Sequence, residues 1–311
     1  MLRTCWIICL CLSSSFFAFY AQKVEIKLQK RIEKELTGFR GTAGVYVENL
    51  KTGKVASVNA DTVFPTASTI KVPIMVGIFS KIETGELNYF QPLVYSDKKQ
   101  LYEGDKGLIA SLKDSTEILL SIVQMLSICT SDNSASLWLQ DLAGTGAAIN
   151  SLMNDLGFKF TRVNSRTPSR ENERKKMGWG QTTPREMATL LVKIRNREIL
   201  SAAACDEMYR VLGTVYYDDR ALSQIPPTVR TASKQGMVSA ARSEVVLVNA
   251  PHGDYVIAVY TKNQEDTSWS TDNEGRQLIK RLSRLVWNYY EPKHQWQPAP
   301  NWQRYEEPDF D

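Results

Sequence analysis

The chain has little of the chemistry that many catalytic centres use. It contains two histidines, His252 and His294, and five cysteines among its 311 residues. His252 lies in turn-like sequence and His294 in a C-terminal stretch without hydrophobic period, so neither suits the general base of a Ser-His-Asp triad. No group of His, Cys, Asp and Glu residues has the spacing of a zinc site. The sequence therefore argues against histidine-dependent serine catalysis and metal catalysis, and we expect no metal and no cofactor.

The sequence also lacks a strong excess of charge of one sign. It has 38 basic and 34 acidic residues, a formal net charge of +4, and 43% hydrophobic and 23% charged residues. This composition is typical of a soluble globular protein with one large or two smaller domains. So small a net charge gives no reason to expect a nucleic-acid partner. The densest basic stretch, Lys159 to Lys176, is interpreted as a solvated loop, with attraction of an anionic ligand as the alternative.

The first residues have the pattern of a secretory signal peptide. Arg3 precedes an apolar run from Cys5 to Ala21, which is interrupted by Ser13 to Ser15. A positive start and an apolar run are typical of export signals, and this run is short for a membrane-spanning helix. We therefore expect a periplasmic or secreted protein that loses residues 1–21, with no stable membrane insertion of the mature chain. An uncleaved N-terminal membrane anchor is the alternative.

Cleavage at this point would remove most of the cysteines. Three of the five lie in residues 1–21, which leaves Cys129 and Cys205. The same segment has one basic and no acidic residue, so the formal net charge falls from +4 to +3. Two cysteines do not make a disulfide scaffold, and we expect both to be free thiols.

Hydrophobic periodicity predicts mixed α and β structure at both ends of the chain. Residues 22–39 have apolar side chains at helical spacing, and residues 42–49 and 55–59 read as the strands of a hairpin. Near the other end, residues 229–233, 244–249 and 254–260 read as strands, and residues 273–290 as an amphipathic helix.

The middle of the chain is predicted to be helical. Expected helices cover residues 72–84, 118–126, 134–142, 147–156, 183–196 and 201–212. Asp114 and Glu117 form a capping box before the second of these, and Thr183 and Glu186 form one before the fifth. Gly157 to Gln181 has no hydrophobic period, and a loop of that length is usually functional or disordered.

These elements predict a two-lobe α/β (α+β) fold in which helices flank an antiparallel sheet. Residues 22–65 and 216–291 would form the α/β lobe, and residues 66–215 an inserted all-helical lobe. Residues 292–311 are rich in Pro, Gln and Trp and are interpreted as an extended tail. A groove between two lobes is a common place for a site. We expect a monomer.

Three short motifs offer serine chemistry without histidine. Ser68 precedes Lys71 where a helix is expected to begin, which places hydroxyl and amine on one face near free backbone N–H groups. Alone, this pattern means little, because about one S-x-x-K is expected by chance in such a chain. Ser131-Asp132-Asn133 precedes a predicted helix, however, and Lys234-Gln235-Gly236 follows a predicted strand. S-x-x-K, S-D-N and K-T-G in this order are the signature of class A β-lactamases and penicillin-binding proteins.

From Val45 to Leu285 the chain resembles a class A β-lactamase-type serine hydrolase. The segments SAARSEVVLV (239–248) and TTPREMATLL (182–191) support the resemblance. It implies that Ser68 is the acylated nucleophile and Lys71 its base. Ser131 would relay a proton to the leaving nitrogen, and Lys234 would hold this relay and attract the substrate carboxylate.

The resemblance also implies a set of substrate contacts. The backbone N–H groups of Ser68 and Met237 would form the oxyanion hole, with Gly236 beside them. Asn133 would bind the side-chain amide of the substrate, and Asp132 would brace the turn. Gln235 stands where the family has Thr or Ser, so a hydroxyl for the substrate carboxylate is missing, and Arg242 on the next strand could compensate.

A second departure concerns the glutamate that activates the deacylating water in class A enzymes. It precedes a proline in the loop before the T-T-P helix, and an ungapped count from Pro184 places Thr167-Pro168 there. Glu171 and Glu173 in the same loop are candidate replacements, although solvent-facing charges are the favoured interpretation.

The expected function is opening of β-lactam rings through a Ser68 acyl-enzyme. Acylation needs the serine, the lysine and the oxyanion hole, whereas deacylation needs a base for water, so we expect slow deacylation. Two alternatives stay open: a D,D-peptidase or esterase that acts on cell-wall-like acyl substrates, and a β-lactam-binding or sensor protein without turnover.

Overall fold

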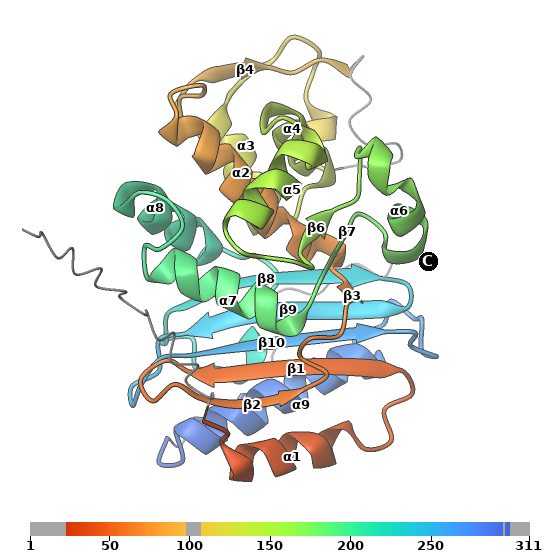
Figure 1. Ribbon diagram of the computed structural model, residues 1–311, viewed down its shortest axis with the longest axis vertical. Coiled ribbons are helices and arrows are strands. Elements are labelled where there is room, and N and C mark those ends of the chain that lie inside the picture. The colour runs from red at the N-terminus through yellow and green to blue at the C-terminus, as the bar shows by residue number, and fades with distance from the viewer. Residues whose placement is uncertain (1–22, 98–106, 295, 299–311) are drawn as a thin grey trace, which may run out of the picture.

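The structure, a computed structural model, describes residues 23–97, 107–294 and 296–298. At its centre is a five-stranded antiparallel sheet with the strand order β2-β1-β10-β9-β8 (Figure 1). The strands are β1 (Thr42–Asn49), β2 (Lys54–Val58), β8 (Thr231–Val238), β9 (Ala241–Val248) and β10 (Tyr255–Lys262). Strands from both ends of the chain therefore form one sheet.

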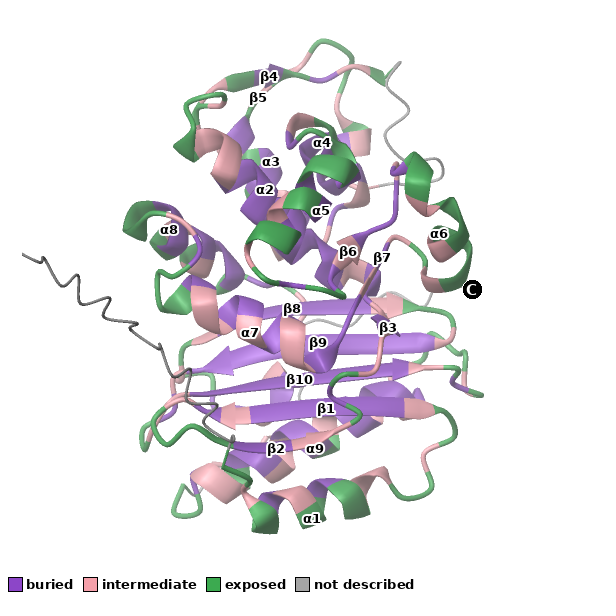
Figure 2. Ribbon diagram, in the orientation of Figure 1, coloured by how far each residue is buried: buried purple, intermediate pink, exposed green. Residues whose placement is uncertain are grey.

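The sheet is covered on both faces, so its strands are mostly buried (Figure 2). α1 (Ile26–Leu36) and α9 (Glu274–Tyr290) cover one face, and α7 (Pro184–Arg195) and α8 (Ala202–Leu212) lie on the other. Along β10, Ile257 and Val259 belong to the core that α1 and α9 line, whereas Val256 and Ala258 belong to the core of α7. Successive strand side chains point to opposite faces, which explains a run of buried residues without alternation.

A group of helices packs beside the sheet around α2 (Lys71–Glu83). α3 (Leu120–Cys129), α4 (Asn133–Leu142) and α5 (Thr145–Asp155) contact α2, which is buried from Lys71 to Phe79. Gly77 permits the close approach, because a Cβ there would lie 3.0 Å from Cγ1 of Ile149 and 3.2 Å from Cβ of Ala143. The sheet with its flanking helices and this helical group make up the fold class that the sequence predicts.

Two predicted segments fall mainly outside the described residues. These are the signal peptide, residues 1–21, and the tail, of which residues 299–311 are not described. Cys129 and Cys205 are free thiols, as expected. No helix in the described part of the chain is both long enough and apolar enough to cross a membrane.

The predicted capping box at Asp114 is wrong. Glu117 begins the strand β5 (Glu117–Leu119), which pairs with β4 (Pro92–Val94), and α3 starts only at Leu120. Asp114 instead accepts hydrogen bonds from N of Asp97 at 3.1 Å and from Oγ of Ser115 at 3.1 Å. An aspartate side chain makes the same local hydrogen bonds in a turn as at the start of a helix. Here β5 pairs with β4, so Asp114 lies in a turn before a strand.

The polar stretch from Gly157 to Gln181 contains regular structure that the sequence does not predict. Its elements are β6 (Arg162–Val163), the 3₁₀ turn η4 (Pro168–Arg170), α6 (Glu171–Met177) and β7 (Gly180–Thr182). β7 lies between β6 and β3 (Phe64–Pro65) in a small antiparallel sheet. Such short strands have no hydrophobic period to detect. Their pairing ties this stretch to the segment that leads to Ser68.

α7 begins as the sequence predicts. The side chain of Thr183 accepts a hydrogen bond from N of Glu186 at 3.2 Å. The carboxylate of Glu186 points to the preceding stretch, where it accepts bonds from the backbone N atoms of residues 159–161 at 2.7–3.0 Å. Oγ1 of Thr161 donates to it at 2.7 Å. One carboxylate therefore satisfies four donors of the turn before β6.

We predict that Glu186→Ala lowers the free energy of unfolding by about 2–4 kcal/mol, because four donors lose a charged acceptor. Urea denaturation followed by circular dichroism measures the change. Glu198→Ala is the matched control, since Glu198 is exposed and accepts a hydrogen bond from Asn196 at 3.0 Å. We expect the control to change stability by less than about 0.5 kcal/mol. Equal losses in the two variants would contradict the prediction.

Candidate active site

Ser68 lies in a 3₁₀ turn, η1 (Ala67–Ile70), between β3 and α2. Hydrogen bonds to Thr66 hold the start of this turn from two sides. N of Thr66 donates to O of Gly180 in β7 at 3.0 Å, and Oγ of Ser243 in β9 donates to O of Thr66 at 2.9 Å. The nucleophile candidate is therefore fixed between the central sheet and the small sheet of β3, β7 and β6.

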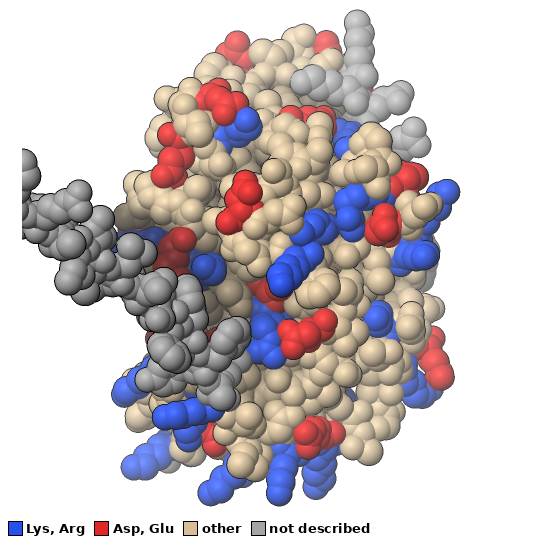
Figure 3. All heavy atoms as spheres, viewed as in Figure 1, with Lys and Arg blue, Asp and Glu red and all other residues tan. Residues whose placement is uncertain are grey.

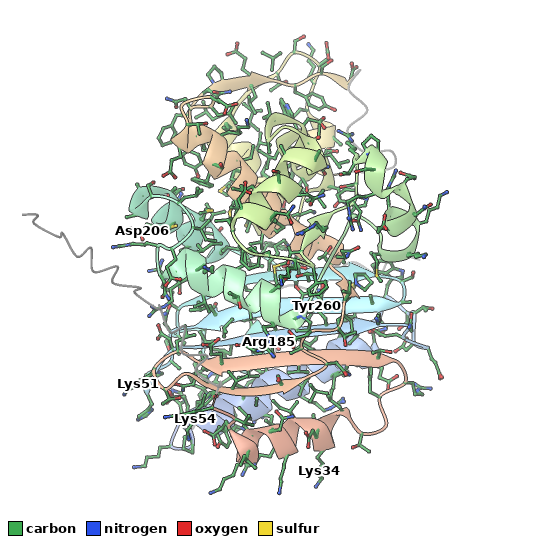
Figure 4. The ribbon with its side chains drawn as sticks, viewed as in Figure 1. Lys34, Lys51, Lys54, Arg185, Asp206 and Tyr260 are labelled. Carbon is green, nitrogen blue, oxygen red and sulfur yellow. The ribbon has the colours of Figure 1, made fainter. Side chains whose placement is uncertain are left out.

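The backbone near the site is strained at two non-glycine residues. Ala67, directly before Ser68, has φ of 46°, and Ser131 has φ of 59°. Left-handed backbone at such residues costs about 1–3 kcal/mol and persists where the surroundings hold it. The hydroxyl of Tyr260, labelled in Figure 4, donates to Oγ1 of Thr69 at 2.9 Å and so ties the turn after Ala67 to β10.

Strand β8 passes directly beside Ser68. A Cβ on Gly236 would lie 2.7 Å from N of Ser68 and 2.6 Å from O of Thr66, so glycine is needed for this approach. β8 continues through Lys234-Gln235-Gly236, which the sequence placed after a strand. It is an edge strand, so one row of its backbone groups has no strand partner. The backbones of Ser68 and Met237 thus lie on adjoining segments.

Ser131 lies between two buried lysine amines. Its Oγ is 3.1 Å from Nζ of Lys71 and 3.1 Å from Nζ of Lys234, and both lysines are fully buried. Burial, and then the charges of Lys71 and Arg220, lower the pKa of Lys234 well below its ordinary value. Two amines that share one hydroxyl repel each other when both are charged. The arrangement therefore favours a neutral amine beside Ser131.

The other residues of the S-D-N motif position this group. Oδ1 of Asp132 accepts from N of Ala135 at 2.8 Å and so caps α4, and Oδ2 accepts from N of Ile109 at 3.0 Å. Oδ1 of Asn133 accepts a hydrogen bond from Nζ of Lys71 at 2.9 Å. Asp132 thus braces the turn, and Asn133 holds the lysine amine.

Two residues expected to bind substrate have partners within the protein. Gln235 is buried, and its Oε1 accepts a hydrogen bond from Nζ of Lys234 at 3.0 Å. Arg242 is fully buried, donates to O of Ser268, and lies 5.6 Å from the ring centroid of Trp269. The guanidinium of Arg242 is therefore bound within the fold in this structure, and its role as a cation for a substrate carboxylate stays a prediction.

The sequence does not predict a buried charged cluster behind β8, which consists of Asp219, Arg220 and Arg276. Nε of Arg220 lies 3.7 Å from Oδ1 of Asp219, and Nη1 of Arg276 lies 3.5 Å from Oδ2 of the same carboxylate. Sδ of Met237 is close to both guanidinium groups: it lies 3.7 Å from Nη2 of Arg220 and 3.2 Å from Nη2 of Arg276. The one signal in the sequence is the charged triplet that ends at Arg220, in a segment without a predicted element.

Glu244 in β9 is a buried carboxyl group next to this cluster. Its Oε2 accepts a hydrogen bond from N of Ala221 at 2.9 Å, and its Oε1 accepts one from Oγ of Ser233 at 3.2 Å. Burial raises the pKa of Glu244 to about 7, against the opposing effects of the Ala221 N–H and the charge of Arg220. This carboxyl group therefore changes charge near neutral pH.

Thr167, which the ungapped count aligns with the deacylating glutamate, packs away from solvent against α5. It is buried, and its Oγ1 donates to O of Ser165 at 2.9 Å. A Cβ on Gly146 in α5 would collide with that Oγ1. The side chain at this position is therefore fixed by its own loop and by α5.

The two candidate replacement carboxylates lie on α6. Glu171 is exposed and pairs with Nη1 of Arg174 at 3.6 Å, and Glu173 is half-buried. Arg170, just before α6, extends inward and donates from Nε to Oδ1 of Asn164 at 2.7 Å.

Among the described residues, no three His, Cys, Asp or Glu side chains gather where they could hold a metal ion.

The fold and this geometry define a class: serine hydrolases in which lysine amines and a second serine stand where other hydrolases use histidine. Comparison with known families agrees. Residues 27–290 match the model of the β-lactamase enzyme family. The chain therefore belongs to the β-lactamase enzyme family, and its predicted resemblance to class A β-lactamase-type serine hydrolases is confirmed.

Individual relatives are distant but span nearly the whole chain. The chain is 23% identical over 294 residues to β-lactamase VEB-1 of Pseudomonas aeruginosa, covering 91% of this chain and 97% of the relative. It is 23% identical to the extended-spectrum β-lactamase PER-1 of the same organism, covering 82% and 85%. The solved structure of a PBP-A mutant, an acyl-enzyme complex with penicillin G, has a TM-score of 0.77 and 28% identity, covering 87% of this chain and 98% of that chain.

We predict that Glu244→Gln removes a pH-dependent part of the stability. The folded protein holds the proton of Glu244 more tightly than the unfolded chain does. Its contribution is therefore complete below pH 4.5 and is lost as the pH rises through about 7. The shift corresponds to roughly 3 kcal/mol. Urea unfolding below pH 4.5 and above about pH 7 should show a larger loss of stability for wild type than for the variant. Parallel pH curves for the two proteins would refute this account.

Proposed function

We propose that this protein is an exported serine hydrolase that opens β-lactam rings through an acyl-enzyme on Ser68. The observation that carries the proposal is the convergence of Lys71 and Lys234 on Oγ of Ser131, each at 3.1 Å, beside the strand that touches Ser68. The relatives support the substrate class: VEB-1 is named a β-lactamase, and the PBP-A mutant is described as an acyl-enzyme with penicillin G. Export rests on the signal-peptide pattern of residues 1–21.

In the proposed acylation, Oγ of Ser68 attacks the lactam carbonyl carbon while Lys71, the base that the family resemblance implies, takes its proton. The oxygen of the tetrahedral intermediate accepts hydrogen bonds from the backbone N–H groups of Ser68 and Met237. The ring C–N bond then breaks, and the lactam nitrogen takes a proton from Ser131. The lysine amines resupply that proton. The product is an ester at Ser68 with the lactam ring open.

The substrate carboxylate is proposed to lie toward Lys234, with Arg220 behind it. Asp219 is shared between Arg220 and Arg276, at 3.7 and 3.5 Å, so one positive charge remains in excess behind β8. The positive charge of Arg220 acts at Lys234, where it helps to lower the pKa of the amine. We therefore propose that Arg220, as a positioning residue, supplies the positive potential that draws the carboxylate toward Lys234.

We predict that Arg220→Gln reduces the second-order rate constant for acylation by a carboxylate-bearing β-lactam about 10-fold, because the positive potential at Lys234 falls. Stopped-flow kinetics with a chromogenic β-lactam measures it. Arg210→Gln is the control, since Arg210 is exposed and pairs with Glu207. Equal rate constants for wild type and the Arg220 variant would exclude this role.

Deacylation is the step for which the chain lacks the family's base. Thr167 stands at the position of the glutamate and has its hydroxyl bonded to a backbone carbonyl. Glu171 pairs with Arg174 on the same helix. Without a carboxylate to activate water, the Ser68 ester is proposed to hydrolyse slowly.

We predict a stoichiometric burst of ring opening followed by slow turnover, with a mass increase on Ser68 equal to the mass of the β-lactam. A quenched-flow assay measures the burst of ring opening, and mass spectrometry measures the mass increase on Ser68. Ser68→Ala should show neither burst nor adduct. Rapid multiple turnover that Glu171→Gln and Glu173→Gln leave unchanged would overturn slow deacylation as proposed here.

Turnover together with the adduct separates the two other candidates. Repeated turnover of the β-lactam supports a β-lactamase. A long-lived Ser68 adduct supports a D,D-peptidase or esterase where the free protein also cleaves acyl-peptides, as the altered loop and Gln235 would suit, and a binding or sensor protein where it cleaves neither.

A further inference from the structure

The outward face of α1 has a row of lysines. Three exposed residues at helical spacings of three and four form what we name the lysine stripe: Lys27, Lys30 and Lys34. The opposite side of the helix buries Leu28 and Ile32. Figure 3 shows Lys and Arg side chains projecting along the lower edge of the molecule, where α1 lies in Figure 1. Lys34 points away from the body of the protein in Figure 4.

The acidic residues of α1 and its start are engaged with other partners. Glu25 pairs with Lys54 at 2.9 Å, and Glu35 pairs with Arg281 at 2.5 Å. Glu33 accepts a hydrogen bond from Gln29 at 2.8 Å. Within the described residues, no lysine of the stripe has an ion pair. Gln29 is neutral, so Glu33 keeps its own negative charge, and the three lysines of the stripe still leave a net positive charge at the surface.

Exposed apolar side chains adjoin the stripe at the start of α1. Ile26 is 62% exposed and Val24 is 57% exposed, and the exposed Lys23 precedes both. Cations beside exposed apolar residues are typical of helices that lie on lipid headgroups, where the apolar groups enter the boundary region.

We propose that this face of α1 docks on an anionic phospholipid surface. Val24 and Ile26 would gain nothing from a polyphosphate in water, which favours lipid over nucleic acid as the partner. α1 and the helical group around α2 lie at opposite ends of the long axis in Figure 1. A surface under α1 therefore leaves the site between the sheet and that helical group clear of lipid. The proposal does not depend on the activity proposed above.

The test compares binding of the full chain to sedimented vesicles of phosphatidylcholine alone and of phosphatidylcholine with added phosphatidylglycerol. The difference between the two vesicle types isolates the charge-dependent part of binding, whether residues 1–21 are attached or removed. Each lysine at an anionic surface contributes about fivefold in partition. The triple variant Lys27→Gln, Lys30→Gln, Lys34→Gln should therefore lower the phosphatidylglycerol-dependent partition about 100-fold. Added salt should weaken wild-type binding in the same direction.

The matched control is the triple variant Lys159→Gln, Lys175→Gln, Lys176→Gln, which removes three exposed cations elsewhere. We expect it to bind like wild type, and circular dichroism reports that each variant is folded. Equal wild-type partition onto both vesicle types overturns the proposal. So does an equal loss in the control, and so does binding to DNA or heparin in place of vesicles.

Discussion

Two buried lysine amines that share the hydroxyl of Ser131 set the geometry on which the rest of the site depends. A buried amine is stable only where hydrogen-bond partners replace water. For Lys71 these partners are Ser131 and Asn133, and for Lys234 they are Ser131 and Gln235. The first turn of α2, the turn before α4 and the edge strand β8 must therefore meet at one point. The strained backbone at Ala67 and Ser131 belongs to this meeting point.

A second group of buried charged residues lies behind β8, and its positive and negative charges nearly cancel when Glu244 is ionised. Asp219 is shared by Arg220 and Arg276, and Glu244 is buried nearby with a pKa of about 7. When Glu244 is neutral, this group has an excess positive charge behind Lys234, and ionisation of Glu244 reduces it. Proton binding at one buried carboxyl group thus links the stability of the fold to the electrostatics of the candidate site.

The polar stretch before α7, Gly157 to Gln181, supports the Ser68 turn and also contains the position of the family's deacylating glutamate. Its short strand β7 holds Thr66 and hence the Ser68 turn, while Glu186 anchors its first residues. At the position of the deacylating glutamate it has Thr167, packed against Gly146 of α5. The loop therefore keeps the support that acylation needs and has threonine where the family has the glutamate that activates water. The lysine stripe lies at the far end of the molecule, so docking there and chemistry at Ser68 use separate surfaces.

The sequence by itself determined the local features: the strands around the sheet, the start of α7 at Thr183, and the Ser68 and Lys71 pair at a helix start. Such features depend on residues a few positions apart, through side-chain period and capping. The family motif added Ser131 and Lys234, but their contacts required the fold. Only the tertiary structure decided that Arg242 is bound to a backbone carbonyl and that Arg220 lies near Lys234. It also decided that residues 117–119 form a strand. The role of a buried charge and the pairing of a short strand both depend on segments that are distant in the sequence and pack against them. Neighbouring residues alone therefore do not predict either one.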